Sequence, residues 1–95
     1  MTFEEHCKQC EEILGNPFPE VHKWLDFYYG KFPLWDRHRQ MRHHLQGITE
    51  IEKLYGHKAA KAAYLHVISD LSMDNWKPEM GTPKDRDDYV KMGLW

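Results

Sequence analysis

The stretch His57-Lys-Ala-Ala-Lys-Ala-Ala-Tyr-Leu-His-Val-Ile-Ser-Asp-Leu71 decides the fold class of this chain. Its apolar residues recur at helical spacing, which predicts a helix over 57–71 with a continuous inward stripe. A second stripe beside it carries His66 and Asp70, which lie four residues apart and therefore on one face. Small residues before His66 leave room for a neighbouring helix. The two stripes are Ala60, Ala63, Tyr64, Val67 and Leu71, and Ala59, Ala62, His66 and Asp70.

Three further helices are expected on the N-terminal side of this segment. Thr2 and Glu5 have the spacing of a capping box, which predicts a helix over 3–14 that ends at Gly15-Asn16. The second helix is expected over about 20–30 and the third, which is the longest, over about 35–55. The apolar stripe of the first helix is expected to be Phe3, Cys7, Cys10 and Leu14, with His6 and Ile13 beside it.

Two details of the later chain complete the expected fold. Gly47 lies within the third helix and permits the close approach of another helix there. Thr82 and Pro83 have the residue types of an N-cap and a first helical position, which predicts a short last helix with Asp85 in its first turn. No segment alternates polar and apolar residues with period two, so no strand is expected. The sequence predicts an all-α bundle of four main helices and a short C-terminal helix, as one domain over residues 1–95.

Composition excludes several classes of protein. With 41% hydrophobic and 14% aromatic residues the chain is not disordered, and a formal net charge of −2 argues against general nucleic-acid binding. No run approaches the roughly 18–20 apolar residues of a membrane span. The N-terminal residues lack the basic and apolar segments of a signal peptide. A cytoplasmic setting is the expectation.

The histidines carry the clearest chemical signal. His22 precedes Asp26 by four residues, as His66 precedes Asp70, so each pair shares a helix face. Imidazole and carboxylate groups are the ligands of zinc and non-haem iron sites. We therefore expect a divalent metal, zinc or iron, between the second, third and fourth helices. The candidate ligands are His22, His43 or His44, His66 and Asp70, with Asp26 as a ligand or as a partner that orients an imidazole.

A structural reading of the same residues stays open. Each aspartate can hydrogen-bond its own histidine, and a network satisfied in this way needs no metal. The sequence does not decide between the two interpretations.

A basic stretch around the central histidines allows a different kind of site. His38 and Arg42 lie four residues apart, so Arg39, Arg42 and His38 are candidates for binding a phosphate or another anion. Such faces are more often solvated, with arginines paired to local carboxylates. We favour the solvated face.

The two cysteines and the aromatic residues have simpler interpretations. Cys7 and Cys10 both fall on the expected apolar stripe, so we interpret them as buried small hydrophobic residues rather than as a zinc or redox motif.

The aromatic residues around the second connector are too many for a chain of this size to bury. We expect a homodimer or a protein partner to cover some of them, and a concentration-independent monomer mass would contradict this. They are Trp24, Phe27, Tyr28, Tyr29, Phe32 and Trp35.

The pattern His38-Arg39-x-x-Arg42-His43-His44-x-x-Gly47-Ile48, followed by His66-Val67-x-x-Asp70-Leu71, resembles a family of small bacterial and phage proteins that carry a domain of unknown function. The resemblance covers most of the chain. It implies no activity, but it implies that one set of residues belongs to a common pattern. The set is His6, His22, His38, His43, His44, His66 and Asp70.

Two hypotheses of function follow. The first is a divalent-metal-binding protein with an interhelical His-rich site, which as an enzyme would activate water for hydrolysis. The second is a phage or mobile-element accessory protein that acts by binding, either to a host defence protein or to a nucleotide. Buried imidazoles that converge on one point would favour the first, and surface histidines beside arginines would favour the second.

Overall fold

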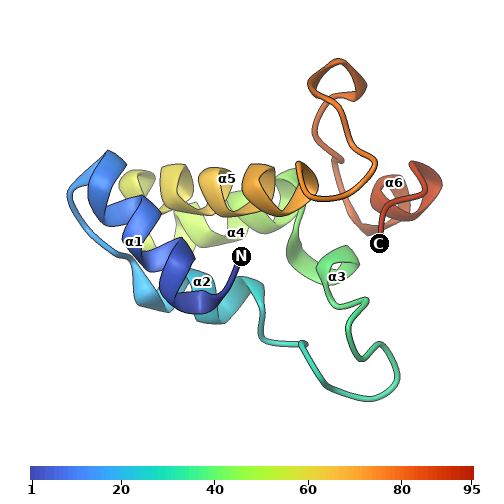
Figure 1. Ribbon diagram of the computed structural model, residues 1–95, viewed down its shortest axis with the longest axis horizontal. Helices are drawn as coiled ribbons and strands as arrows, with labels where there is room; N and C mark the ends of the chain where they lie inside the picture. The colour runs from blue at the N-terminus through green and yellow to red at the C-terminus, as the bar shows by residue number, and fades with distance from the viewer.

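Helix α5 (His57–Leu71) is the element around which the chain folds, as the sequence predicts. The computed structural model describes residues 1–95, and α1, α2 and α4 all pack along α5 (Figure 1). Helices α3 and α6 contact each other at one end of the molecule. No strand forms, so the predicted all-α class is confirmed. The remaining elements are α1 (Phe3–Leu14), α2 (Pro19–Leu25), α3 (Arg39–Arg42), α4 (Leu45–Tyr55), the 3₁₀ helix η1 (Pro78–Met80) and α6 (Arg86–Lys91).

The alanines of α5 explain how closely its neighbours approach. Ala59, Ala62 and Ala63 are fully buried, and their short side chains let α1, α2 and α4 pack against the α5 backbone. Gly56, with φ +99°, ends α4 and begins α5, so these two helices form a hairpin. Thirteen buried residues make up the hydrophobic core around this hairpin. They are Cys10, Phe18, Val21, Leu25, Ile51, Ala59, Ala62, Ala63, Val67, Leu71, Trp76, Tyr89 and Leu94.

The prediction of one helix over 35–55 is wrong, because the chain breaks at His43-His44. His44 has extended backbone angles and caps α4, with its Nδ1 accepting a hydrogen bond from the Gly47 amide at 3.1 Å. Its Nε2 donates to the carbonyl oxygen of Met41 at 3.0 Å. The His44 imidazole thus hydrogen-bonds to backbone groups on both sides of the break. In a continuous helix these groups would have been paired with other backbone groups.

Gly47 serves this break rather than the approach of a distant helix. A Cβ atom built on it would lie 2.0 Å from the carbonyl oxygen of Arg42, at the end of α3. Only glycine allows the α3 backbone to fold back this tightly over the first turn of α4. Gly47 thereby allows the tight turn that places His43.

Gly47→Ala is expected to destabilise the protein by about 1–3 kcal/mol, because backbone must move to relieve the overlap. This corresponds to a fall in melting temperature of about 5–20 °C for a domain of this size. Thermal denaturation followed by circular dichroism measures it. Thr49→Ala, on the exposed side of the same helix, is the control and should change the melting temperature little. Equal melting temperatures for the two variants would contradict the role given to Gly47.

Two other helix boundaries also differ from expectation. Helix α2 ends at Leu25 rather than near residue 30, and turns follow it. The last helix begins at Arg86, whereas the sequence predicts Thr82 as its N-cap and Pro83 as its first residue. Its N-cap is Asp85, whose side chain accepts a hydrogen bond from the Asp88 amide at 2.9 Å. The carbonyl groups of Pro83 and Lys84 instead accept hydrogen bonds from the first two amides of α4, both at 2.9 Å, so this segment holds the start of α4 in place.

The aromatic residues after α2 are mostly on the surface. Phe27, Tyr29, Phe32 and Trp35 are all more than half exposed. This exposure is what the expectation of a dimer or a protein partner requires, and that expectation stays a prediction. None of the helices has the length and apolar character needed to cross a membrane.

Candidate metal centre

Six of the seven histidines are buried, and four of them gather where α1, α2, α5 and the junction of α3 with α4 meet. Two aspartates join them. The helices bring to one place residues that lie far apart in the sequence. The group consists of His6 from α1, His22 from α2, Asp26 directly after α2, His43 from the α3–α4 junction, and His66 and Asp70 from α5.

Asp26, His43, Asp70 and His66 form a closed ring of contacts in which each imidazole nitrogen lies between two carboxylates. His43 Nε2 lies 3.0 Å from Asp70 Oδ2 and 3.3 Å from Asp26 Oδ1. His66 Nε2 lies 3.2 Å from Asp70 Oδ2 and 3.5 Å from Asp26 Oδ2. Atoms bound to one tetrahedral zinc ion at about 2.0–2.2 Å lie about 3.3 Å from one another. The four residues therefore have the spacing of a ligand set and could hold a metal ion.

A hydrogen-bond relay determines which nitrogen of His66 carries a proton. His22 Nε2 lies 2.9 Å from the carbonyl oxygen of Pro17, which can only accept, so this nitrogen is protonated. Burial and the neighbouring His66 lower the pKa of His22 to about 4, so the ring is neutral and its Nδ1 is an acceptor. His66 Nδ1, 2.8 Å away, must then donate to it. A neutral His66 consequently presents an unprotonated Nε2 to the two carboxylates.

That arrangement needs a positive charge. A lone pair facing two carboxylates is repelled by both, and His66 Nε2 makes no hydrogen bond. One solution is protonation: burial lowers the pKa of His66, but contacts with Asp26 and Asp70 outweigh it and raise the pKa above its usual value. The other solution is a metal cation in the ring. In both cases Asp26 and Asp70 are ionised, because contacts with the surrounding imidazoles outweigh burial and lower both pKa values well below the ordinary range.

His6 adds a fifth donor beside the ring. Its imidazole stacks on that of His66 with centroids 3.6 Å apart, and its Nε2 lies 3.2 Å from Asp70 Oδ1. The side chain is buried, yet neither of its nitrogens makes a hydrogen bond. Burying two unpaired polar atoms is unfavourable, and Nε2 lies where it could bind an ion held by Asp70.

His38 and Arg39 surround the ring from the α3 side. His38 Nε2 lies 3.1 Å from Asp26 Oδ1 and holds that carboxylate in place. Arg39 donates from one terminal nitrogen to Asp74 at 3.2 Å, and its other terminal nitrogen lies 3.7 Å from Asp70 Oδ1. Both residues thus orient the aspartates of the ring.

The other residues of interest lie elsewhere. His44 caps α4 and does not face the ring. Arg42 covers the Trp24 ring at 3.9 Å and donates to the Trp24 carbonyl at 2.9 Å, so it joins α2 to α3 and does not converge with Arg39. Cys10 is buried in the core, and Cys7 is partly exposed; both are free thiols.

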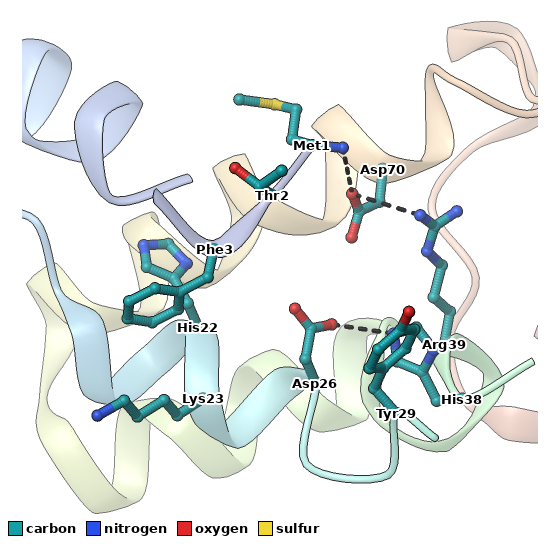
Figure 2. Close-up of a pocket in the computed structure, with 10 residues that line it drawn as sticks. All are labelled: Met1, Thr2, Phe3, His22, Lys23, Asp26, Tyr29, His38, Arg39 and Asp70. Carbon is teal, nitrogen blue, oxygen red and sulfur yellow. Dashed lines mark hydrogen bonds and ion pairs between the residues drawn. The ribbon is translucent and has the colours of Figure 1, made fainter. Parts of the chain in front are cut away.

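A cavity of about 540 Å³ opens beside the ring (Figure 2). Asp26 and Asp70 face each other across it. His38 and Arg39 line the side on the right of Figure 2, opposite Phe3. The aromatic rings of Phe3 and Tyr29 also line it. An ion held between the two carboxylates would therefore be reachable by a small molecule.

Helical spacing in the sequence did not single out His6. The predicted stripe of the first helix includes Cys10, which α1 buries, but also Phe3 and Cys7, which are more exposed, and it places His6 only beside the stripe although His6 is buried. The usable signal was the spacing of four from His6 to Cys10 and from Cys10 to Leu14, which places a histidine on the true inward face. Only the family resemblance groups His6 with the other histidines of the site.

Comparison with known proteins identifies the family. The chain belongs to the family described as Domain of unknown function (DUF6915), which matches residues 1–92. No curated protein and no solved structure matches the chain significantly.

Proposed function

We propose that this member of the DUF6915 family binds one divalent transition-metal ion through His43, His66, Asp26 and Asp70, with His6 as a fifth donor. The position of His66 Nε2 carries the proposal, because the relay from Pro17 through His22 places the proton of a neutral His66 on Nδ1 and leaves Nε2 free to bind a cation. This nitrogen points at two ionised carboxylates, where a cation is the natural occupant. Residues that hydrogen-bond to a metal-bound histidine usually fix its tautomer and orientation. The relay does the same for the His66 imidazole.

The donor set favours zinc or iron(II). Mixed imidazole and carboxylate ligands suit these ions, and two carboxylates balance a charge of two. The competing arrangement is a protonated His66 with Arg39 as the second cation. It gives His6 Nε2 only the 3.2 Å contact with Asp70 Oδ1, whereas an ion in the ring would make this nitrogen a ligand.

The open cavity supports a hydrolytic role for the centre. A divalent ion in the ring would supply Lewis acidity and would activate water. His38 lies at the edge of the cavity and contacts Asp26, so it is placed to orient that carboxylate. A binding role without catalysis would require no such access to the ion.

Protein purified without a histidine tag is expected to contain close to one zinc or iron per chain by elemental analysis. His57→Ala is the matched control, because His57 is the one histidine outside the buried set and its side chain is 77% exposed. This variant should retain the metal. Metal-free protein that stays folded and takes up neither zinc nor iron(II) from solution would overturn the proposal in favour of the protonated network.

A further inference from the structure

The cavity beside the ring has the features of a ligand site, and not only of an entrance. We propose that it binds a phosphate monoester, with the phosphate group between the metal ion and Arg39 and the organic group against Phe3 and Tyr29. The inference rests on the proposed function, because it places the metal ion at one side of the phosphate. It adds the class of ligand, which the ring alone does not specify.

Arg39 provides the first reason. Its Nε is buried and makes no hydrogen bond, and the terminal nitrogen that faces Asp70 lies 3.7 Å from the carboxylate, beyond hydrogen-bond distance. The opposite terminal nitrogen is held by Asp74. The guanidinium is therefore positioned by Asp74 and still has donors unused on the side of the cavity, where Figure 2 shows it reaching toward Asp70. Its planar set of donors matches the oxygens of a phosphate group.

Charge provides the second reason. Among the lining groups, the carboxylates of Asp26 and Asp70 are balanced by Lys23, Arg39 and the amino terminus of Met1. A divalent ion in the ring leaves the lining with a positive net charge, so the cavity attracts a dianion. The two cationic features that would contact the ligand directly, the ion and Arg39, both adjoin Asp70, which places them close enough to share one phosphate group.

Size and lining provide the third reason. A volume of about 540 Å³ far exceeds that of a phosphate group and falls within the range of sites for small organic ligands. Phe3 and Tyr29 are both partly exposed and line the cavity (Figure 2). Their rings offer an apolar surface for the part of the ligand beyond the phosphate.

The test uses zinc-loaded protein and two probes, inorganic phosphate and phenyl phosphate, in isothermal titration calorimetry. Both probes are expected to bind, and phenyl phosphate more tightly. Arg39→Gln should weaken both about 10-fold or more, since it removes charged hydrogen bonds. Tyr29→Ala should weaken phenyl phosphate but not inorganic phosphate. Arg37→Gln is the matched control, because Arg37 lies outside the cavity over the Trp95 ring, and it should leave both affinities unchanged.

Zinc content is measured on every variant, so failure of the metal site is seen separately from failure of the phosphate site. Zinc-loaded protein that binds neither probe would overturn the proposal while leaving the metal site intact. Equal binding to zinc-free and zinc-loaded protein would also overturn it, because the phosphate would then not contact the ion. Arg39→Gln that retains zinc and binds both probes like the wild type would remove Arg39 from the site.

Discussion

Asp70→Asn is expected to lower the affinity for zinc by more than about 100-fold, beyond the roughly 10–100-fold that loss of an outer partner costs. Asp70 contacts all three imidazoles that face the ring, from His43, His66 and His6, at distances of 3.0–3.2 Å. Asparagine keeps the shape of the side chain but removes its charge and one of its two acceptor oxygens. The change therefore weakens the attraction for the ion more than it disturbs the packing.

Competition with a chromophoric chelator measures this affinity. Asp74→Asn is the matched control, since Asp74 binds the same arginine but lies outside the ring, and it should change the affinity only a few-fold. His22→Phe keeps a ring of similar size and ends the relay to His66, so it should cost about 10–100-fold. Asp70→Asn with wild-type affinity would show that the ion, if bound, lies elsewhere.

Removal of the metal is expected to lower the melting temperature by about 15 °C or more. An ion at a thousand times its dissociation constant stabilises the folded state by about 4 kcal/mol, and each kcal/mol shifts the melting temperature of such a domain by about 4–8 °C. The physical reason is the two carboxylates of the ring, Asp26 and Asp70, which lose their main source of positive charge. Calorimetry of chelator-treated protein, with and without added zinc, measures the difference. A melting temperature that does not respond to zinc would contradict the prediction.

The pH dependence of the metal-free protein follows from its histidines. Burial lowers the pKa of His22 to about 4 and also lowers the pKa of His6 and of His44. An unfolded histidine takes up its proton near pH 6.5, so these three favour the folded state above that pH and lose their contribution as the pH falls. His66, with its raised pKa, has the opposite effect and contributes most below pH 6.5.

The melting temperature of the chelator-treated protein is expected to fall between pH 7 and pH 5, because the buried His22, His6 and His44 each resist protonation in the folded state. Asp26 and Asp70, whose pKa values are lowered, add a further loss as the pH drops below about 4. Scanning calorimetry in buffers across this range measures it. A melting temperature that rises toward pH 5 would mean that the protonation of His66 dominates.

The sequence predicted correctly those helices whose boundaries depend on residues next to them in the chain. The capping box at Thr2 and the alanine-rich run of α5 determine their helices through neighbouring residues alone. The break at His43-His44 could not be predicted, because the apolar spacing continues through it and histidine is not among the preferred N-caps. What stops the helix is the satisfaction of backbone groups by the His44 ring, which depends on the folded arrangement.

The candidate site, like the fold, could be predicted from the sequence only in part. Spacing of four placed His66 beside Asp70, and His22 beside Asp26, on single helices. The structure brings Asp26, His43, His66 and Asp70 together, but gives His22 the role of partner to His66 and leaves His44 at the cap. Which histidine of an adjacent pair turns inward depends on the backbone angles at the junction. Helical periodicity carries no information about those angles.

The ring joins segments that are distant along the chain: Asp70 follows His43 by 27 positions, and the neighbouring contact of His22 with His66 spans 44 positions. An ion held there acts as a cross-link that closes long loops, whereas the hairpin of α4 and α5 depends on local contacts across Gly56. Without the ion, α1 and α2 would be fastened to the hairpin by the small core and by a few direct contacts, such as those of His22 with His66 and of Gln9 with Ser69. The hairpin would then persist while α1 and α2 open together as a cooperative unit. Binding of the ion would therefore set how often the core is exposed to solvent.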